Sequence, residues 1–437
     1  MQLDDAGGKS SLGPFFIDIE MYLSSLLNVL RVINKLEGSY GSVFLVGGGV
    51  RDALLGLDVT DVDIAVEGSG IELARVLARD LKGNLVVHSD FNTATVTLQS
   101  CSIDVAMARS EIYANPGELP VVSPANIEKD LGRRDFTINA MAINFDILNQ
   151  GQLIDPYGGR NDLENKIIRV LHDQSFIDDP TRLFRAARYA ARYDFYLDDH
   201  SKELAQSYTK TGSLDALSSA RIGNELVLLL SEQEGISALE KLEEIGITDL
   251  IHPNLDASLL ARNLMKKAEE INTDLGIDAV TWRLRFAILT RLFLSRDRYA
   301  WLESLQLKQC DINVIAQAAE LSSVITDRVV TPMPRSALYS LLIESPIEAV
   351  VIALADTPKG SEAENALRMF ATELRFVSLE IGGEELVALG LSQSPDVGKL
   401  LARLLFLKLD GEILTRSDEL CAAQKLIEDG GFCDPSH

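Results

Sequence analysis

The chain has 437 residues, enough for several hydrophobic cores, and its 65 acidic against 41 basic side chains give a net charge of −24. So acidic a chain is a poor nonspecific binder of polyanions, and any nucleic-acid contact requires a local cluster of basic residues. No apolar run approaches the ~20 residues that span a bilayer, so we expect no membrane association. The four scattered cysteines include no Cys-x-x-Cys pair, which argues against a zinc site or disulfide framework and favours a cytoplasmic location.

The chain begins with residues 1–15, an acidic stretch that we expect to be a flexible leader. Apolar residues at helical spacing then predict a helix from Ile17 to Leu36. The short apolar run Val43–Val46 is typical of a buried strand, and it is followed by three consecutive glycines. A short amphipathic helix is predicted from Val50 to Leu55, with Gly56 as its end.

The next predicted strand, 61–66, carries two carboxylates. Asp61 and Asp63 occupy alternate positions, so their side chains lie on the same face of the strand. Two neighbouring carboxylates repel each other unless a cation sits between them, and Mg²⁺ prefers such hard oxygen ligands. The glycine turn at Gly47 and Gly48 offers backbone N–H groups to a phosphate, and Arg51 adds a bidentate donor. The combination indicates a nucleotidyl-transfer site.

The pattern Gly47-Gly48-x-Val50-Arg51-Asp52 followed by Asp61-x-Asp63 resembles the head signature of class II tRNA nucleotidyltransferases and the related bacterial poly(A) polymerases. These enzymes belong to the DNA polymerase β-like nucleotidyltransferase superfamily. The resemblance implies a head with a small mixed sheet, Mg²⁺ held by Asp61 and Asp63, CTP and ATP as substrates, and tRNA as the partner.

The remainder of the head is expected to contain a helix over 71–81 and strands over 83–88, 94–98 and 102–106. Asp104 lies where this superfamily often carries a third acidic residue, which implies a catalytic role in metal binding or in activating the attacking hydroxyl. The alternative is a structural ion pair between Asp104 and Arg109. Arg109 itself resembles a family position that contacts substrate phosphate.

Residues 110–129 contain Asn-Pro-Gly and Leu-Pro steps and are predicted to be a long loop. In the family this connection holds the flexible loop of the enzymes that add the final A, so its length favours an enzyme able to add A.

Two further motifs continue the resemblance. The run from Arg133 to Ala142, RRDFTINAMA, matches the family without a gap, and it predicts that Arg134 contacts phosphate and that Asn139 bonds a ribose hydroxyl. The run DPYGGRNDL, from Asp155 to Leu163, resembles the family's connection from head to neck. It is either a hinge or an ordinary tight turn, and we assign it no catalytic role.

The last strong motif is DDPTRLFRAARY, from Asp178 to Tyr189. Either Asp178 or Asp179 caps a helix whose first turn contains Pro180. The arginines recur every three or four residues along one side of this helix, and they are Arg182, Arg185, Arg188 and Arg192. The resemblance implies that Asp179 and Arg182 select the incoming base and that Arg185 and Arg188 bind the triphosphate.

Selection by this pair follows donor–acceptor logic. Cytosine and adenine both place an exocyclic amine beside a ring-nitrogen acceptor, which suits a carboxylate beside a guanidinium. Uracil and guanine invert the pattern. The protein can therefore act as its own template for C and A.

Beyond residue 194 helical patterns dominate, over 202–207, 220–230, 235–245, 257–270, 280–295 and 314–323 and again after 333. We predict an α+β protein with a head (16–154) followed by an all-α neck (155–215), body (216–330) and tail (331–437). The resemblance implies that the tail holds the tRNA elbow. The predicted activity is addition of the 3′-terminal CCA to tRNA, with A-only addition, CC-only addition, a poly(A) polymerase, and an inactive RNA-binding protein as alternatives.

Overall fold

The computed structural model describes residues 15–18, 23, 26–36, 39–59, 61–88, 92–99, 101–112, 121–146, 148–211, 214–329, 333–392 and 395–429, without the side chains of Asp61, Ile112 and Thr211. The chain divides into two compact units. Unit 1 comprises Met1–Ser218 with Glu244–Leu250, and unit 2 comprises Ser219–Glu243 with Ile251–His437. The predicted leader lies outside the described residues apart from Phe15.

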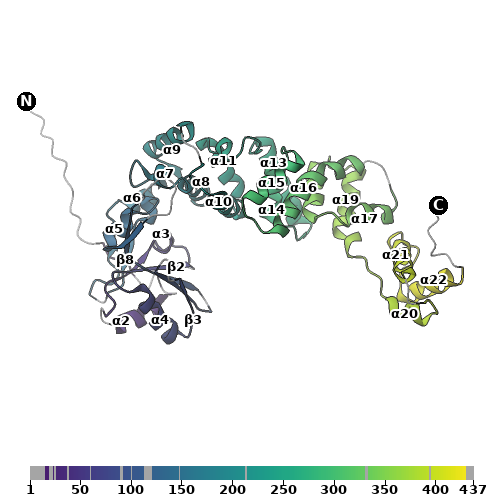
Figure 1. The fold of residues 1–437 in the computed structure, drawn as a ribbon, viewed down its shortest axis with the longest axis horizontal. Helices are drawn as coiled ribbons and strands as arrows, with labels where there is room; N and C mark the ends of the chain where they lie inside the picture. Colours follow the sequence, from purple (N-terminus) through teal and green to yellow (C-terminus); the bar gives the residue numbers. More distant parts are fainter. Residues whose placement is uncertain are drawn as a thin grey trace, which may run out of the picture. The chain divides into compact units, whose positions relative to one another are not determined.

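Unit 1 contains a mixed seven-stranded sheet with the order β3-β4-β5-β2-β1-β8-β9. Figure 1 labels β2, β3 and β8 among its strands. The strands of the sheet are β1 (Val43–Val46), β2 (Asp61–Val66), β3 (Asn84–His88), β4 (Thr93–Thr97), β5 (Ser102–Met107), β8 (Ala142–Asn144) and β9 (Leu153–Ile154). β2 and β5 pair in parallel, and the other neighbours pair antiparallel. The strands predicted from sequence are confirmed to within one residue at each end.

The two faces of the sheet have different partners because side chains alternate along each strand. Val43 and Leu45 join the core formed with α2 (Leu27–Lys35), α3 (Gly48–Leu54) and α4 (Gly70–Leu81). Figure 1 shows α2 and α4 together on that side of the sheet. Phe44 and Val46 face the other way and pack against α5 (Ile127–Gly132). This second face carries the polar site.

The predicted helix over 17–36 was wrong at Ile17, Asp18 and Leu23, which are not helical, and it is confirmed by α2 from Leu27 onward, while residues 19–22, 24 and 25 lie outside the described residues. Phe16 forms a bridge with Gln152, and the N–H of Leu153 donates to the carbonyl of Phe15. The described residues 15–18 thus use their backbone groups at the sheet edge beside β9. Apolar spacing could not reveal this competition between a helix and a free edge.

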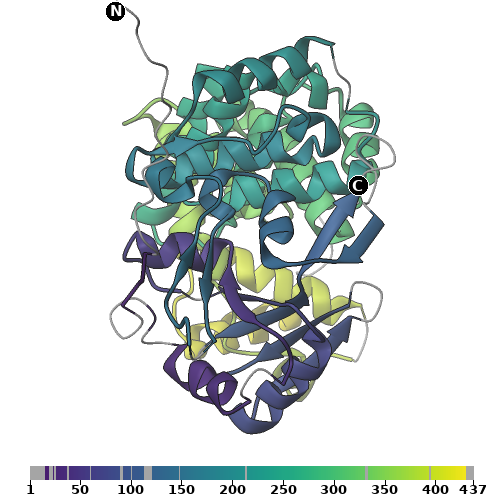
Figure 2. The ribbon, with the colours of Figure 1, turned by 90° about the vertical axis from the view of Figure 1, so that its left-hand side faces the viewer.

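The predicted loop over 110–129 was wrong at both of its ends. β6 (Arg109–Ile112) pairs with β7 (Val121–Pro124) in a separate two-stranded ribbon, drawn in blue in Figure 2. α5 follows, and the side chain of Asn126 caps it by accepting from the N–H of Lys129. The cap and the β-branched Val121 and Val122 were the overlooked signals. Residues 113–120, which join the two strands, lie outside the described residues.

Unit 1 also contains one short helix before β8 and several elements after β9. These elements are η3 (Thr137–Asn139), which precedes β8 in the chain, α6 (Gly159–Glu164), β10 (Ile167–Ile168), α7 (Ser175–Asp178), α8 (Thr181–Tyr193), β11 (Tyr196–Leu197) and α9 (Asp199–Thr211). Leu183, Phe184, Ala186 and Ala187 of α8 are fully buried. This burial holds the polar side of α8 in place within unit 1.

Unit 2 is helical throughout its described residues, and α11 and α12 straddle the division between the units. Its helices are α10 (Ser219–Ser231), α11 (Gly235–Ile245), α12 (Thr248–Ile251), α13 (Leu259–Asp274), α14 (Thr281–Leu289), α15 (Ser295–Ser304), α16 (Gln309–Arg328), α17 (Arg335–Leu342), α18 (Ile347–Asp356), α19 (Glu362–Thr372), η4 (Leu374–Phe376), α20 (Gly383–Ala388), α21 (Asp396–Leu409) and α22 (Arg416–Glu428). The last three share a hydrophobic cluster of their own. The mixed sheet followed by helices confirms the predicted α+β class.

The helix predicted over 280–295 was also wrong, because α14 ends at Leu289 and α15 starts at Ser295. The buried guanidinium of Arg298 donates to the carbonyls of Thr290, Arg291 and Phe293, which fall in the break. A helix has no partners for its last carbonyls, so an arginine from a neighbouring turn stabilises the end. Within the described residues no single helix passes the length and hydropathy test for a membrane span, although α17 and α18 pass it together across a 115° bend.

Candidate active site

An acidic edge forms where β2 and β5 run side by side. The register pairs Asp63 directly with Asp104, so the two carboxylates project from the same face of neighbouring strands. Val62 and Ile64 point to the opposite face and are buried in the core. The hydroxyl of Thr95, on β4, donates to Asp104 Oδ1 at 2.6 Å. Asp61 begins β2 opposite Ser102, and its side chain lies outside the described part of the structure.

The pair formed by Asp63 and Asp104 fits a divalent cation chemically. Both side chains are exposed, both offer hard oxygen atoms, and their adjacency is unfavourable without a positive charge nearby. Among the described side chains no group of three His, Cys, Asp or Glu comes together as a metal site. The metal role of Asp61, Asp63 and Asp104 therefore stays a prediction.

The alternative role for Asp104, an ion pair with Arg109, was wrong. Arg109 instead bonds Glu111 on the same strand, with Nη2 at 3.0 Å from Oε1. The two residues are separated because the pairing register sends Asp104 toward β2 and β4, whereas Arg109 belongs to the β6–β7 ribbon.

The glycine turn after β1 comes very close to the acidic edge. Gly47 has φ +69°, a backbone conformation that favours glycine. A Cβ atom there would lie 2.7 Å from Arg134 Nη1 and 3.5 Å from Asp63 Oδ2. Gly47 thus lets the backbone approach both a predicted phosphate ligand and a predicted metal ligand, and Gly48 continues the turn into α3.

Replacing Gly47 by alanine is expected to lower kcat/KM about tenfold, because the new methyl group displaces Arg134. Backbone strain of about 1–2 kcal/mol comes in addition. Gly56→Ala is the matched control, since Gly56 has φ +70° but nothing within 4 Å of its would-be Cβ. We expect both variants to lose similar thermal stability, while only Gly47→Ala loses activity. Equal losses of activity would show that strain alone matters.

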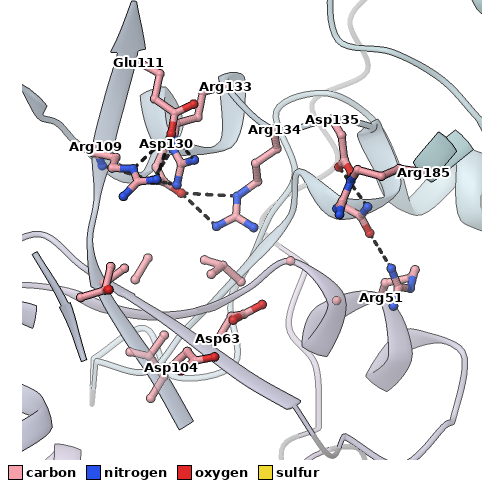
Figure 3. Close-up of a pocket in the computed structure, with 18 of the residues that line it drawn as sticks. Arg51, Asp63, Asp104, Arg109, Glu111, Asp130, Arg133, Arg134, Asp135 and Arg185 are labelled. Carbon is pink, nitrogen blue, oxygen red and sulfur yellow. Dashed lines mark hydrogen bonds and ion pairs between the residues drawn. The ribbon is translucent and has the colours of Figure 1, made fainter. Parts of the chain in front are cut away.

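Arg51 is buried and sits at the end of a chain of contacts that connects α3 to α8. Its Nη1 donates to Asn139 Oδ1 at 2.7 Å, and its guanidinium lies 4.6 Å from the centre of the Tyr193 ring. Asn139 in turn donates to Asp135 at 3.0 Å, and Asp135 pairs with Arg185 at 2.7 Å. Figure 3 shows this row from Arg185 to Arg51. The predicted ligands Arg51, Asn139 and Arg185 are therefore brought together.

The carboxyl group of Asp135, which accepts hydrogen bonds from Asn139 and Arg185 in this row, is ionised. Burial alone raises the pKa of its carboxyl, but the Arg185 guanidinium and the hydrogen bonds from Asn139 and from the Phe136 N–H outweigh burial and hold that pKa below its ordinary value. An ionised acceptor strengthens the bonds that it receives.

A second cluster surrounds Asp130, which the sequence analysis did not single out. Its carboxylate is buried and pairs with Arg133 at 2.8 Å and with Arg134 at 3.0 Å, while it also accepts from the Arg109 N–H at 3.1 Å (Figure 3). Glu111 pairs with Arg133 from the other side at 2.8 Å. One buried carboxylate thus holds the guanidiniums of Arg133 and Arg134 and the backbone of Arg109, and Arg134 and Arg109 are predicted phosphate ligands. Asp130 precedes Arg133 by three residues and Arg134 by four, at one helix end. This spacing, which is typical of ion pairs on a helix, was the signal in the sequence.

Asp130→Asn is expected to destabilise the fold by about 1.5–3 kcal/mol and to lower kcat/KM about tenfold, because two guanidiniums lose their charged acceptor. Burial raises the pKa of this carboxyl, but Arg134 and Arg133 hold it below the ordinary 3.8. The stabilisation is therefore present at neutral pH and is lost as pH falls through the lower folded value. Urea unfolding should show a large difference between variant and wild type at pH 7 that shrinks below about pH 4. Asp80→Asn, on the exposed face of α4, is the control and should change neither quantity.

The junction between α7 and α8 and the first turn of α8 supply the predicted base-selecting residues, Asp179 and Arg182. Asp179 Oδ1 accepts from the N–H of Thr181 at 3.1 Å and from its hydroxyl at 2.7 Å, which is the bonding of a helix cap. Of the two capping candidates, Asp179 is thus the one with these bonds. Arg182 is buried, and Nη2 donates to the carbonyl of Arg133 at 2.9 Å. Arg182 N donates to Asp179 O at 3.1 Å, so the two residues are held together through the backbone.

These groups surround one cavity of about 770 Å³ in unit 1. Of the predicted site residues, those that line it are Gly47, Gly48, Arg51, Asp63, Asp104, Arg109, Arg134, Asn139, Asp179, Arg182 and Arg185. Arg188 is buried and is not among the lining residues, and its ring contact is with Tyr189. Lining residues that the sequence analysis did not assign include Asp52, Glu111, Asp130, Arg133, Asp135, Tyr189 and Arg192.

Charge in the cavity is balanced, with seven arginines and seven carboxylates on its walls. The whole chain carries −24, so the arginines are concentrated where an anionic ligand would enter. The seven arginines are the local group of basic side chains that the composition requires for contact with a polyanion, although carboxylates on the same walls balance their formal charge.

Comparison with known proteins places this geometry in a family. Residues 43–169 match the model of the poly A polymerase head domain. An A-adding tRNA nucleotidyltransferase of Geobacter sulfurreducens is 34% identical over 88% of this chain, which spans only 45% of that protein's length. An A-adding tRNA nucleotidyltransferase of Halalkalibacterium halodurans is 32% identical, with 92% of each chain covered.

Solved structures of known proteins resemble this structure over nearly the whole length of the chain. A CCA-adding enzyme of Thermotoga maritima complexed with tRNA superposes with a TM-score of 0.74 at 29% identity, covering 94% of this chain and 97% of that one. A relative from Deinococcus radiodurans that is 31% identical over 91% of this chain is named a CC-adding tRNA nucleotidyltransferase. A head of the poly(A) polymerase type, with paired carboxylates beside an arginine-lined cavity, defines a nucleotidyltransferase. The chain belongs to the class II tRNA nucleotidyltransferase family.

Proposed function

We propose that this protein extends the 3′ end of tRNA without a nucleic-acid template and that it adds at least the terminal A from ATP. The observation that carries the proposal is a single cavity that joins the acidic edge of Asp63 and Asp104 to the neck residues Asp179 and Arg182. The specific step is supported by the two relatives named A-adding, one of which is covered over 92% of its length.

In the proposed reaction the RNA 3′-hydroxyl attacks the α-phosphate of the nucleoside triphosphate, and pyrophosphate leaves. Asp63 and Asp104, with Asp61 by resemblance, would hold Mg²⁺, which supplies positive charge to the reacting phosphate and lowers the pKa of the attacking hydroxyl. Arg134 and Arg109 bind and orient the triphosphate, and Asp130 keeps Arg134 in place.

Selection of the base is assigned to Asp179 and Arg182, which face the same cavity. The carboxylate accepts from the exocyclic amine of adenine, and the guanidinium donates to the ring nitrogen. Guanine presents a carbonyl where adenine has its amine, so it would leave the carboxylate facing an oxygen. The tRNA elbow is assigned to α20, α21 and α22, as the resemblance implies.

Complete CCA addition is the second candidate. It is favoured by the structural likeness to a CCA-adding enzyme over 94% of the chain. Both candidates use the same cavity, so they differ in which tRNA ends are accepted.

The test offers the purified protein three tRNA transcripts, ending at the discriminator base, after the first C and after CC, with each nucleotide in turn. Addition of A to the CC transcript alone supports A-adding activity, and extension of all three with C and then A supports complete CCA addition. Extension of the first two with C but of none with A would contradict the proposal and point to CC addition. Repeated A addition to any RNA would identify a poly(A) polymerase.

A further inference from the structure

A fully buried serine in α7 contacts both residues of the base-selecting pair. The hydroxyl of Ser175 accepts from Arg182 Nη1 at 2.6 Å, and the carbonyl of Ser175 lies 3.5 Å from the same nitrogen. That carbonyl also accepts from the N–H of Asp179 at 3.3 Å. Ser175 does not line the cavity, so its contacts reach the site only through Asp179 and Arg182.

Arg182 is held from two sides. Nη1 is bonded to Ser175, and Nη2 donates to the carbonyl of Arg133 at 2.9 Å. A guanidinium is planar, so two bonds to its two terminal nitrogens determine the plane of the whole group. The N–H directions that remain for a ligand are thereby set before any nucleotide arrives. The pair is preorganised, which is the condition for discrimination between bases by hydrogen bonds.

We propose that Ser175 is a positioning residue for nucleotide selection, acting with the Arg133 carbonyl to hold the Arg182 guanidinium in the orientation that suits adenine. The inference rests on the proposed function. It assigns part of the specificity to a side chain that touches no substrate.

Removing the hydroxyl frees the guanidinium to change its plane. Arg182 Nη1 then keeps only the longer contact with the Ser175 carbonyl. A rotated guanidinium presents its donors equally well to the O6 carbonyl of guanine, so the penalty against the wrong base falls. Arg182 keeps its charge and its place in the cavity wall. The overall affinity for nucleotides should therefore change less than the preference between bases.

The experiment compares Ser175→Ala and Ser175→Cys with wild type, using the tRNA transcript that the wild type extends. Cysteine roughly keeps the volume but is a weak acceptor. We expect the ratio of kcat/KM for ATP to that for GTP to fall about tenfold in both variants, because one charge-assisted bond is lost.

Ser201→Ala is the matched control. Ser201, on α9, is also fully buried, and its hydroxyl accepts from the N–H of Val170 at 3.0 Å. It does not line the cavity. Its loss should lower the melting temperature as much as Ser175→Ala does and leave the ATP to GTP ratio unchanged.

The proposal is overturned if the Ser175 variants keep the wild-type ratio, or if Ser201→Ala shifts it equally. Failure of both Ser175 variants to fold would also overturn it, since Ser175 would then be a structural residue. Equilibrium binding of ATP and GTP, measured by calorimetry without tRNA, separates this inference from the proposed function. If the wild type extends no tRNA, the function fails, while a changed ATP to GTP affinity ratio in the variants still supports the role of Ser175.

Discussion

Asp63→Ala is expected to reduce nucleotide incorporation on the order of a thousandfold, because a carboxylate that neutralises and holds a divalent cation contributes several kcal/mol to the transition state. The fold should be unaffected. Asp63 is exposed on the sheet face opposite the core, and the register places it directly beside Asp104. Removal of one of two adjacent like charges leaves no packing defect and relieves repulsion.

The measurement is single-turnover incorporation across a range of Mg²⁺ concentrations, with thermal melting as the check on folding. Asp58→Ala, an exposed aspartate that does not line the cavity, is the control and should behave as wild type. Asp104→Ala tests the second carboxylate: a comparable loss supports a shared cation, and full activity would remove Asp104 from the site. Near-normal turnover of Asp63→Ala would contradict the prediction that Asp63 binds a metal ion.

Asp179→Ala is expected to lower incorporation of ATP by about ten- to a hundredfold relative to GTP. The substitution removes the acceptor for the exocyclic amine of adenine, at roughly 1–3 kcal/mol for the missing partner. Guanine has no amine at that edge and so loses less. The preference between the two bases should therefore collapse while the rate with the correct base falls.

The competing explanation is that Asp179 serves only as a cap. Its Oδ1 does accept from the N–H and hydroxyl of Thr181, so loss of about 1 kcal/mol of stability is expected in either case. A pure cap predicts that all four nucleotides decline by the same factor. Ser361→Ala provides the comparison, because Ser361 caps α19 through the N–H of Glu364 in unit 2 and should lose stability without any change in nucleotide preference.

The strands of the head could be read directly from the sequence. Val43–Val46 is a short, buried apolar run followed by a glycine turn, and Asp61–Val66 is a run in which the buried Val62 and Ile64 flank the exposed Asp63. Such local patterns are enough to identify both strands. The same argument placed the two carboxylates of β2 on one face. The motifs around Gly47, Arg134 and Asp179 likewise indicated a nucleotidyltransferase before any contact was known.

Errors arose where distant backbone groups competed for the same hydrogen bonds. Ile17 was predicted to begin a helix, yet its N–H bonds the carbonyl of Gly151 at the edge beside β9, next to the bridge between Phe16 and Gln152. The carbonyls after Leu289 are satisfied by Arg298, which ends α14 early. Each partner lies outside the stretch whose periodicity predicts the helix, so the local pattern does not contain the information that ends it.

The sequence by itself determined which residue types reach the site, since charge, glycine placement and strand alternation are local properties. Only the tertiary structure decided how they are held. Asp130 and Asp135 bind their arginines across helix ends and between helices, and Ser175 meets Arg182 across a turn. Arg188 shares the spacing of its neighbours on α8, yet it does not line the cavity. Orientation depends on partners that converge only after the sheet and helices α7 and α8 have packed, because a planar guanidinium takes its direction from whichever acceptors lie within reach.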